Sequence, residues 1–196
     1  MKIFFKCVSV IIFLVIVMFC FCSKHNPQVL IKTGLGDITV EIYVKDAPIT
    51  AANFLKYVNE DRFQGATFYR VVRMDNQPDN DVKIEVIQGG LEEDDHPLML
   101  PSIEHETTKE TGILHKDGVI SMARLEPGTA SSEIFICIGH QPELDFGGKR
   151  NPDGQGFAAF GKVINGMDVV RKIQTQPDEG QMLKQEIDIK GIFLMQ

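Results

Sequence analysis

The feature that most constrains the fold of this chain is the recurrence of short β-forming runs. Segments rich in valine, isoleucine, phenylalanine and tyrosine alternate with segments rich in glycine, proline, asparagine and aspartate. We expect strands at residues 29–33, 37–43, 67–72, 83–88, 119–124, 134–138, 159–163 and 185–194. The first two are joined by Gly34-Leu35-Gly36, which is typical of a hairpin turn.

Only two windows have helical spacing of apolar residues. Pro48 opens the first, which ends near Asp61, and the second covers residues 166–173. Many short strands with two helices predict a mainly β fold, a closed antiparallel barrel whose ends the helices cap. The long intervals 90–118 and 139–158 are expected to form surface loops.

Residues 1–22 differ in kind from the rest of the chain. Lys2 and Lys6 precede an almost wholly apolar run that ends at Cys22, and this is the pattern of a secretory signal. Three interpretations stay open: a bacterial lipoprotein signal with Cys22 as the lipidated residue, an uncleaved anchor, and an ordinary cleaved signal. Each of them sends the following domain across a membrane.

The remainder is one domain's worth of chain, which we divide into a short linker at residues 23–28 and a single domain at residues 29–196. The net charge is −7, and the charged residues follow no pattern along the chain. This acidic balance argues against nucleic acid as a partner. Cys137 is the one cysteine of this domain, and it lies in the apolar run 134–138, so we expect it to be buried.

Five short blocks follow one another through the domain. They are Phe68-Tyr69-Arg70-Val71-Val72, Ile87-Gln88-Gly89-Gly90, Ile120-Ser121-Met122-Ala123-Arg124, Ile134-Phe135-Ile136 and Phe160-Gly161-Lys162-Val163. Together and in this order they resemble the cyclophilin family of peptidyl-prolyl cis-trans isomerases. The resemblance implies that the closed antiparallel barrel has eight strands.

Isomerisation of an X–Pro bond needs neither a nucleophile nor a general base. The barrier of about 18–20 kcal/mol comes from the partial double-bond character of the C–N bond. A fixed donor to the prolyl nitrogen stabilises the pyramidal nitrogen of the twisted state more than the planar ground state. Arginine suits this task because it stays protonated and presents rigid donors. We expect no cofactor and no metal.

The resemblance assigns roles to individual residues. Arg70 matches the catalytic arginine, and Gln88 matches the glutamine that holds the substrate carbonyl and this arginine. Phe135 matches the aromatic floor of the proline pocket, although an aromatic residue inside a strand is more often part of a core. Val86, Leu144 and Phe157 match the apolar walls of this pocket. Ala123 and Arg124 match the segment whose backbone binds the part of the substrate that precedes the proline.

Several positions depart from the family pattern. Glu133 replaces the usual glutamine beside the floor, and we expect it to face the same groove as Arg70. There it pairs with the guanidinium and orients it, or competes with substrate for its donors. Glu85 stands where the family has a pocket phenylalanine. The additional polar residues 74–84 indicate a surface hairpin near the active face.

We therefore expect a monomeric prolyl isomerase that assists the folding of exported proteins. Its substrates would be unfolded or flexible proline-containing polypeptides in the periplasm or cell envelope, with the enzyme held at the membrane by its N-terminal segment. The alternative is a binding module, a holdase or scaffold that grips proline-containing segments with little turnover. Arg70 favours the enzyme, because a pure binder has no need of it, whereas Glu85 and Glu133 keep the alternative open.

Overall fold

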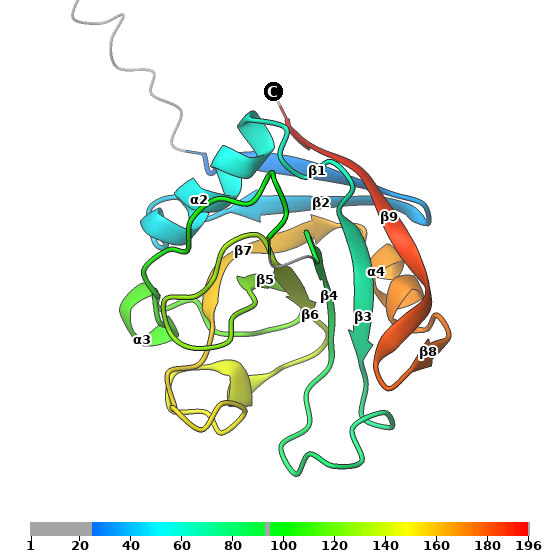
Figure 1. The fold of residues 1–196 in the computed structure, drawn as a ribbon. Coiled ribbons are helices and arrows are strands. Elements are labelled where there is room, and N and C mark those ends of the chain that lie inside the picture. The colour runs from blue at the N-terminus through cyan, green and yellow to red at the C-terminus, as the bar shows by residue number, and fades with distance from the viewer. Residues whose placement is uncertain (1–24, 93–94, 196) are drawn as a thin grey trace, which may run out of the picture.

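The computed structural model describes residues 25–92 and 95–195 of the chain (Figure 1). The membrane-targeting segment expected at residues 1–22, including the lipidation candidate Cys22, lies outside the described residues. Within the described ranges, no helix has both the length and the apolar character needed to cross a membrane.

Nine strands and three α-helices make up the described fold, together with one 3₁₀ helix. The strands are β1 (Gln28–Thr33), β2 (Gly36–Ile42), β3 (Thr67–Val72), β4 (Val86–Gly90), β5 (Val119–Met122), β6 (Ile134–Cys137), β7 (Ala158–Asn165), β8 (Asp178–Glu179) and β9 (Met182–Leu194). The helices are α2 (Pro48–Asn59), α3 (Thr108–Thr111), α4 (Met167–Gln174) and the 3₁₀ helix η1 (Pro142–Leu144).

Eight of the strands close into an antiparallel barrel. Their order is β1-β2-β7-β5-β6-β4-β3-β9, and β9 pairs back onto β1. The two-residue strand β8 pairs with β9 outside this ring. The expected closed eight-stranded antiparallel barrel is therefore confirmed (Figure 1).

Helices α2 and α4 pack against the barrel at different strands. Helix α2 contacts β7 and β9, and α4 contacts β2, β3 and β4. Pro48 occupies the first turn of α2, where its missing N–H costs nothing. The buried carboxylate of Glu106 accepts the backbone N–H groups of Ile49 at 3.1 Å and Thr50 at 2.6 Å. An acceptor from a distant loop thus caps this helix.

The apolar side chains form two separate clusters, because neighbouring residues of a strand point to opposite faces. The inner core fills the barrel and includes Ile134 and Ile136 of β6. Phe135 and Cys137, which alternate with them, face outward. The outer cluster consists of Val72, Ile84, Val86, Phe135, Cys137 and Leu144, with Ala123 and Phe157 packed against it. Cys137 is fully buried there, as expected, and burial raises the pKa of its thiol.

Several boundaries differ from those expected. The fourth strand begins at Val86 and not at Lys83, and β5 ends at Met122, so Ala123 and Arg124 follow the strand. Residues 74–84 form no hairpin. They fold as a loop around Gln77, whose side-chain amide donates to the carbonyls of Arg73 at 2.6 Å and Ile84 at 2.8 Å. A buried glutamine at the centre of the loop replaces the cross-strand ladder that a hairpin would need.

Candidate active site

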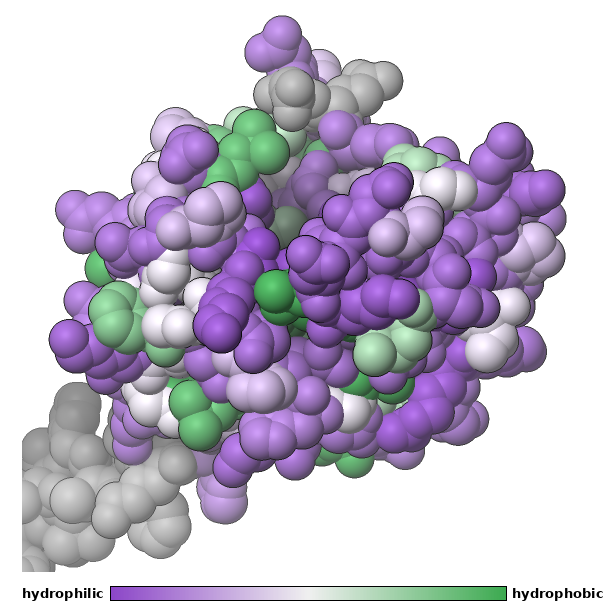
Figure 2. Space-filling model, turned by 90° about the horizontal axis from the view of Figure 1, so that it is seen from below, coloured by the Kyte–Doolittle hydropathy of each residue, from purple (hydrophilic) through white to green (hydrophobic). Residues whose placement is uncertain are grey.

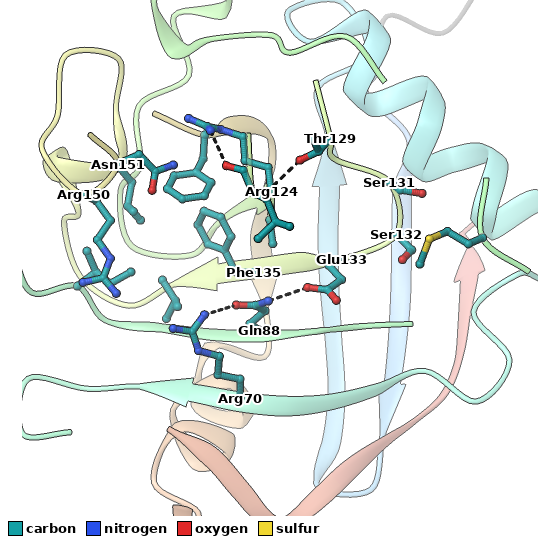
Figure 3. Close-up of a pocket in the computed structure, with 17 residues that line it drawn as sticks. Arg70, Gln88, Arg124, Thr129, Ser131, Ser132, Glu133, Phe135, Arg150 and Asn151 are labelled. Atoms are coloured by element: carbon teal, nitrogen blue, oxygen red, sulfur yellow. Dashed lines mark hydrogen bonds between the residues drawn. The ribbon is translucent and has the colours of Figure 1, made fainter. Parts of the chain in front are cut away.

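Strand register brings three of the expected site residues together on the outer face of the barrel. Arg70 on β3 is directly opposite Gln88 on β4, and Gln88 is opposite Phe135 on β6. Residues directly opposite on neighbouring strands project to the same face. These side chains therefore line one groove of about 410 Å³, shown in Figure 3.

The apolar part of the groove is the exposed side of the outer cluster. Phe135 meets the edge of Phe157 at 5.2 Å between ring centroids, with an interplanar angle of 88°. Val86, Leu144 and Ile84 also line this part of the groove. The structure thus brings together all four apolar residues expected in the pocket and adds Ile84, which the sequence analysis did not single out.

Arg70 is clamped between two glutamines. Its Nη1 donates to Gln88 Oε1 at 2.9 Å, and its Nε and Nη2 donate to Gln181 Oε1 at 3.2 Å and 2.6 Å. Gln181 lies in the β8–β9 turn with a positive φ of 79°. Burial lowers the pKa of Arg70, and the Glu133 carboxylate opposes that shift. The guanidinium is held in one orientation by neutral acceptors, and no carboxylate among the described residues pairs with it directly.

Glu133 does not pair with Arg70 directly, so that part of the expectation is wrong. Its Oε2 accepts from the Tyr69 hydroxyl at 2.6 Å and from Gln88 Nε2 at 2.7 Å. Burial and the hydrogen bond to Glu133 raise the pKa of Tyr69. Because Gln88 stands between Glu133 and Arg70, the carboxylate acts on the guanidinium through the amide, as the dashed lines of Figure 3 show.

Gln88 has no amide hydrogen left for a substrate. Its Nε2 donates to the Tyr69 hydroxyl at 2.7 Å and to Glu133, while its Oε1 accepts from Arg70. The family role of holding both the substrate carbonyl and the arginine is therefore reduced to the second part in this arrangement. Gln88 positions Arg70, and Glu133 fixes which way the Gln88 amide points.

The Arg124 side chain is bonded to the loop that precedes β7. It donates to both carboxylate oxygens of Asp153, at 2.8 Å and 3.0 Å, and to the carbonyl of Gly156. Its guanidinium also lies 5.2 Å from the Phe157 ring centroid. Arg124 thus fixes the loop that carries Phe157, and the adjoining Ala123 lines the groove.

Two loops extend the groove beyond the strands. One is the β3–β4 loop, residues 73–85, and the other is the loop of residues 145–157 before β7. Arg150 joins them, because its Nη1 donates to Gln77 Oε1 at 3.0 Å and to the Val82 carbonyl at 2.7 Å. The end of the molecule that bears these loops is largely hydrophilic and hollowed, with a small apolar area inside (Figure 2). No sequence periodicity marks Arg150 or Gln181, so they were not foreseen.

A serine, a histidine and an aspartate lie in line behind the pocket floor. His115 is fully buried, contacts Asp145 Oδ1 through Nδ1 at 2.8 Å and Ser121 Oγ through Nε2 at 3.0 Å, and stacks on Phe135. Ser121 is equally buried, so this arrangement supports the floor and does not face substrate. Among the described residues, no group of three or more histidine, cysteine, aspartate or glutamate side chains is placed to hold a metal ion.

A closed antiparallel barrel that carries a peptide-sized groove, an apolar floor and a clamped arginine on its outer face defines the class of protein. The comparisons with known proteins agree. Residues 28–192 match the family model described as cyclophilin type peptidyl-prolyl cis-trans isomerase/CLD. The chain belongs to this family, and it is a peptidyl-prolyl cis-trans isomerase.

Individual relatives support the assignment. A peptidyl-prolyl cis-trans isomerase of Acinetobacter baylyi is 34% identical over 163 residues, which cover 83% of this chain and 79% of the relative. Peptidyl-prolyl cis-trans isomerase B of Escherichia coli is 31% identical over 155 residues, covering 75% and 84%. A crystal structure of a Cryptosporidium parvum cyclophilin type isomerase in the presence of the dipeptide Ala-Pro has a TM-score of 0.69 at 22% identity. It covers 86% of this chain and 99% of that chain, and shows the shared fold.

Proposed function

We propose that this isomerase works by donation from Arg70 to the prolyl nitrogen while the outer cluster holds the proline ring. The observation that carries the proposal is the clamp on Arg70, whose Nε, Nη1 and Nη2 all bond to glutamine oxygens. A donor fixed before the reaction spends no free energy on reorganisation when the amide twists. A guanidinium has five N–H donors, so two glutamines still leave hydrogens for the substrate.

The groove supplies the second part of the mechanism. Phe135, Phe157, Val86 and Leu144 offer an apolar surface that suits a proline ring, whereas the planar amide lies toward the polar rim. We place the peptide on the N-terminal side of the proline beside Ala123. Holding the ring while the preceding carbonyl rotates converts binding energy into stabilisation of the twisted state.

The direct test is the rate of cis-trans exchange on an Ala-Pro peptide, measured by NMR exchange spectroscopy with the full chain in detergent. The unmodified protein should accelerate exchange without added metal or nucleotide. Arg70→Ala should lower kcat/KM at least ~100-fold, since a preorganised donor contributes about 2.7–4 kcal/mol. Arg171→Ala removes a remote exposed arginine that pairs with Asp117 and should leave the rate unchanged. Full activity in a folded Arg70→Ala protein would remove this mechanism.

We also propose that the enzyme assists the folding of exported proteins from the membrane surface. The support is the charged and apolar pattern of residues 1–22, with Cys22 as the attachment point for lipid. Labelled fatty acid should enter the unmodified protein, and Cys22→Ala should abolish the labelling. A Cys22→Ala protein that stays fully membrane-bound would favour an uncleaved helix instead, and a wholly soluble unmodified protein would exclude both anchors.

A further inference from the structure

The arginines of this protein fall into two groups. Four of the six form ion pairs with carboxylates: Arg62, Arg73, Arg124 and Arg171. Arg70 and Arg150 form none within the described ranges, and both line the groove. Arg70 is accounted for by the isomerisation mechanism, whereas Arg150 has no role in it.

Arg150 is held so that part of its guanidinium remains available. Its hydrogen bonds to Gln77 and to the Val82 carbonyl both use Nη1, and its backbone N–H donates to the Glu143 carbonyl. Within the described structure its Nε and Nη2 have no hydrogen-bond partner. Burial and the positive charge of Arg70 both lower the pKa of Arg150, so the two cations share one region of the groove. The loops have thus placed a second, half-buried cation near the catalytic one.

The two ends of the groove differ in charge. Glu133, Ser131 and Ser132 lie on one side of Phe135, and Arg150 and Asn151 lie on the other, as Figure 3 shows. Asn151 adds a buried side-chain nitrogen without a hydrogen-bond partner in the described structure. Donors without a partner therefore gather at the Arg150 end, which is the arrangement that suits an anionic group of a ligand.

We propose that Arg150 forms a carboxylate subsite that selects substrates in which an acidic residue follows the proline. This inference rests on the proposed function, which places the residues before the proline beside Ala123. We extend that path so that the residues after the proline pass toward Arg150, which lines the same groove. A glutamate or aspartate side chain at that position can accept hydrogen bonds from Nε and Nη2 of Arg150 in the parallel geometry that guanidinium favours. The groove then recognises the side chain of the residue that follows the proline.

The test compares three acetylated and amidated peptides. Ala-Pro-Glu and Glu-Pro-Ala each carry one carboxylate, on the glutamate side chain, and Ala-Pro-Gln carries none. For the unmodified full chain we expect kcat/KM on Ala-Pro-Glu to exceed that on Ala-Pro-Gln by about fivefold at low salt, the upper range for a solvent-accessible ion pair. The ratio should shrink as salt rises. It should fall to about one in Arg150→Gln and be partly retained in Arg150→Lys.

Controls separate recognition from a structural effect. Arg171→Gln removes the same charge from a remote exposed position and should leave the Glu/Gln ratio unchanged. If Arg150→Gln only loosened the loops, it would lower both rates and keep their ratio, which would overturn the proposal. A ratio of one in the unmodified protein, or a preference for Glu-Pro-Ala, would overturn it as well.

A binding measurement keeps this inference apart from the proposed function. The dissociation constants of the same peptides, followed by NMR titration, should show the same preference for Ala-Pro-Glu and its loss in Arg150→Gln. Turnover without selectivity would contradict the subsite alone. Selective binding without turnover would support the subsite and contradict the Arg70 mechanism.

Discussion

The inner and outer faces of the same strands contribute differently to this protein: the inner face to stability and the outer face to the groove. On β6, Ile134 and Ile136 point into the barrel and Phe135 and Cys137 point outward. The inner core is closed on all sides, so its apolar contacts contribute to stability. The outer cluster is covered by loops on one side and open to the groove on the other, so its contacts remain available to a ligand.

The difference between the closed inner core and the open outer cluster shows where polar functional groups can be accommodated. The barrel interior is filled by buried apolar side chains, whereas the rim of the outer cluster holds Arg70, Gln88 and Glu133 in a connected hydrogen-bond network. The functional residues therefore lie on the outer face of strands whose inner face forms the core. Substitutions on the two faces should separate these two contributions.

The largest effect should come from the inner core. Phe160 on β7 is fully buried and packs against Phe54 at 5.1 Å between ring centroids. Phe160→Ala should lower the free energy of unfolding by about 3–5 kcal/mol, since it removes transfer free energy and leaves a cavity. Chemical denaturation measures this. Activity of the folded fraction at low temperature should be preserved, and a selective loss of activity without destabilisation would contradict the division between the faces.

Phe135→Ala is the matched change in the outer cluster. It removes the pocket floor, so kcat/KM on an Ala-Pro peptide should fall ~10–100-fold, which corresponds to about 1.5–3 kcal/mol for a buried apolar side chain. Its cost in stability should be smaller than that of Phe160→Ala, because one side of the ring faces the groove. Denaturation and exchange rates of both variants, measured together, decide the point. Equal destabilisation with normal activity would show that Phe135 belongs functionally to the core.

The clamp on Arg70 predicts an effect at Gln181, which is not among the residues that line the groove. Gln181→Met keeps the length of the side chain and removes the oxygen that accepts from Nε and Nη2 of Arg70. We expect kcat/KM to fall about tenfold, because hydrogen bonds to a charged group contribute roughly 1.5–3 kcal/mol. The affinity for substrate should change little, since the loss concerns the orientation of the donor. A fall confined to affinity would contradict the positioning role.

The smallest change concerns Glu133. In Glu133→Gln a neutral amide replaces the carboxylate that accepts from Tyr69 and Gln88, so Gln88 is held less firmly. Activity should stay equal or fall by about two- to threefold, within the range of one weakened charge-assisted hydrogen bond. The turnover-to-affinity ratio at two salt concentrations measures it. A clear gain would mean that the carboxylate competes with substrate for donors in the groove.

The barrel could be predicted from the sequence because its strands carry alternating or continuous apolar runs bounded by turn residues. The outward direction of Phe135 could not be predicted in this way. Residues 134–138 are apolar at every position, so no alternation of polar and apolar residues distinguishes the two faces of the strand. Only the resemblance to a known family separated this ring from the core. The buried loop around Gln77 was missed because a polar segment gives the same signal whether it forms a hairpin or a loop.

The residues around Arg70 show a second limit. Glu133 and Arg70 were correctly expected on one groove, but strand register places Gln88 between them, and a one-residue difference in register would have removed it. Gln181 and Arg150 come from turns and loops far along the chain, where no periodic pattern predicts position. Long-range contacts of loops are set by packing that sequence spacing does not encode.

The central claim is that Arg70 stabilises the twisted amide more than the planar one. The measurement that tests it most directly is the separate determination of exchange rate at saturation and of peptide affinity for the unmodified protein and for Arg70→Ala, by NMR line shapes on one Ala-Pro peptide. The account predicts a fall of about 100-fold in the saturated rate, with affinity changed only severalfold. An affinity loss that accounts for the whole decrease in kcat/KM, with the saturated rate intact, would contradict it.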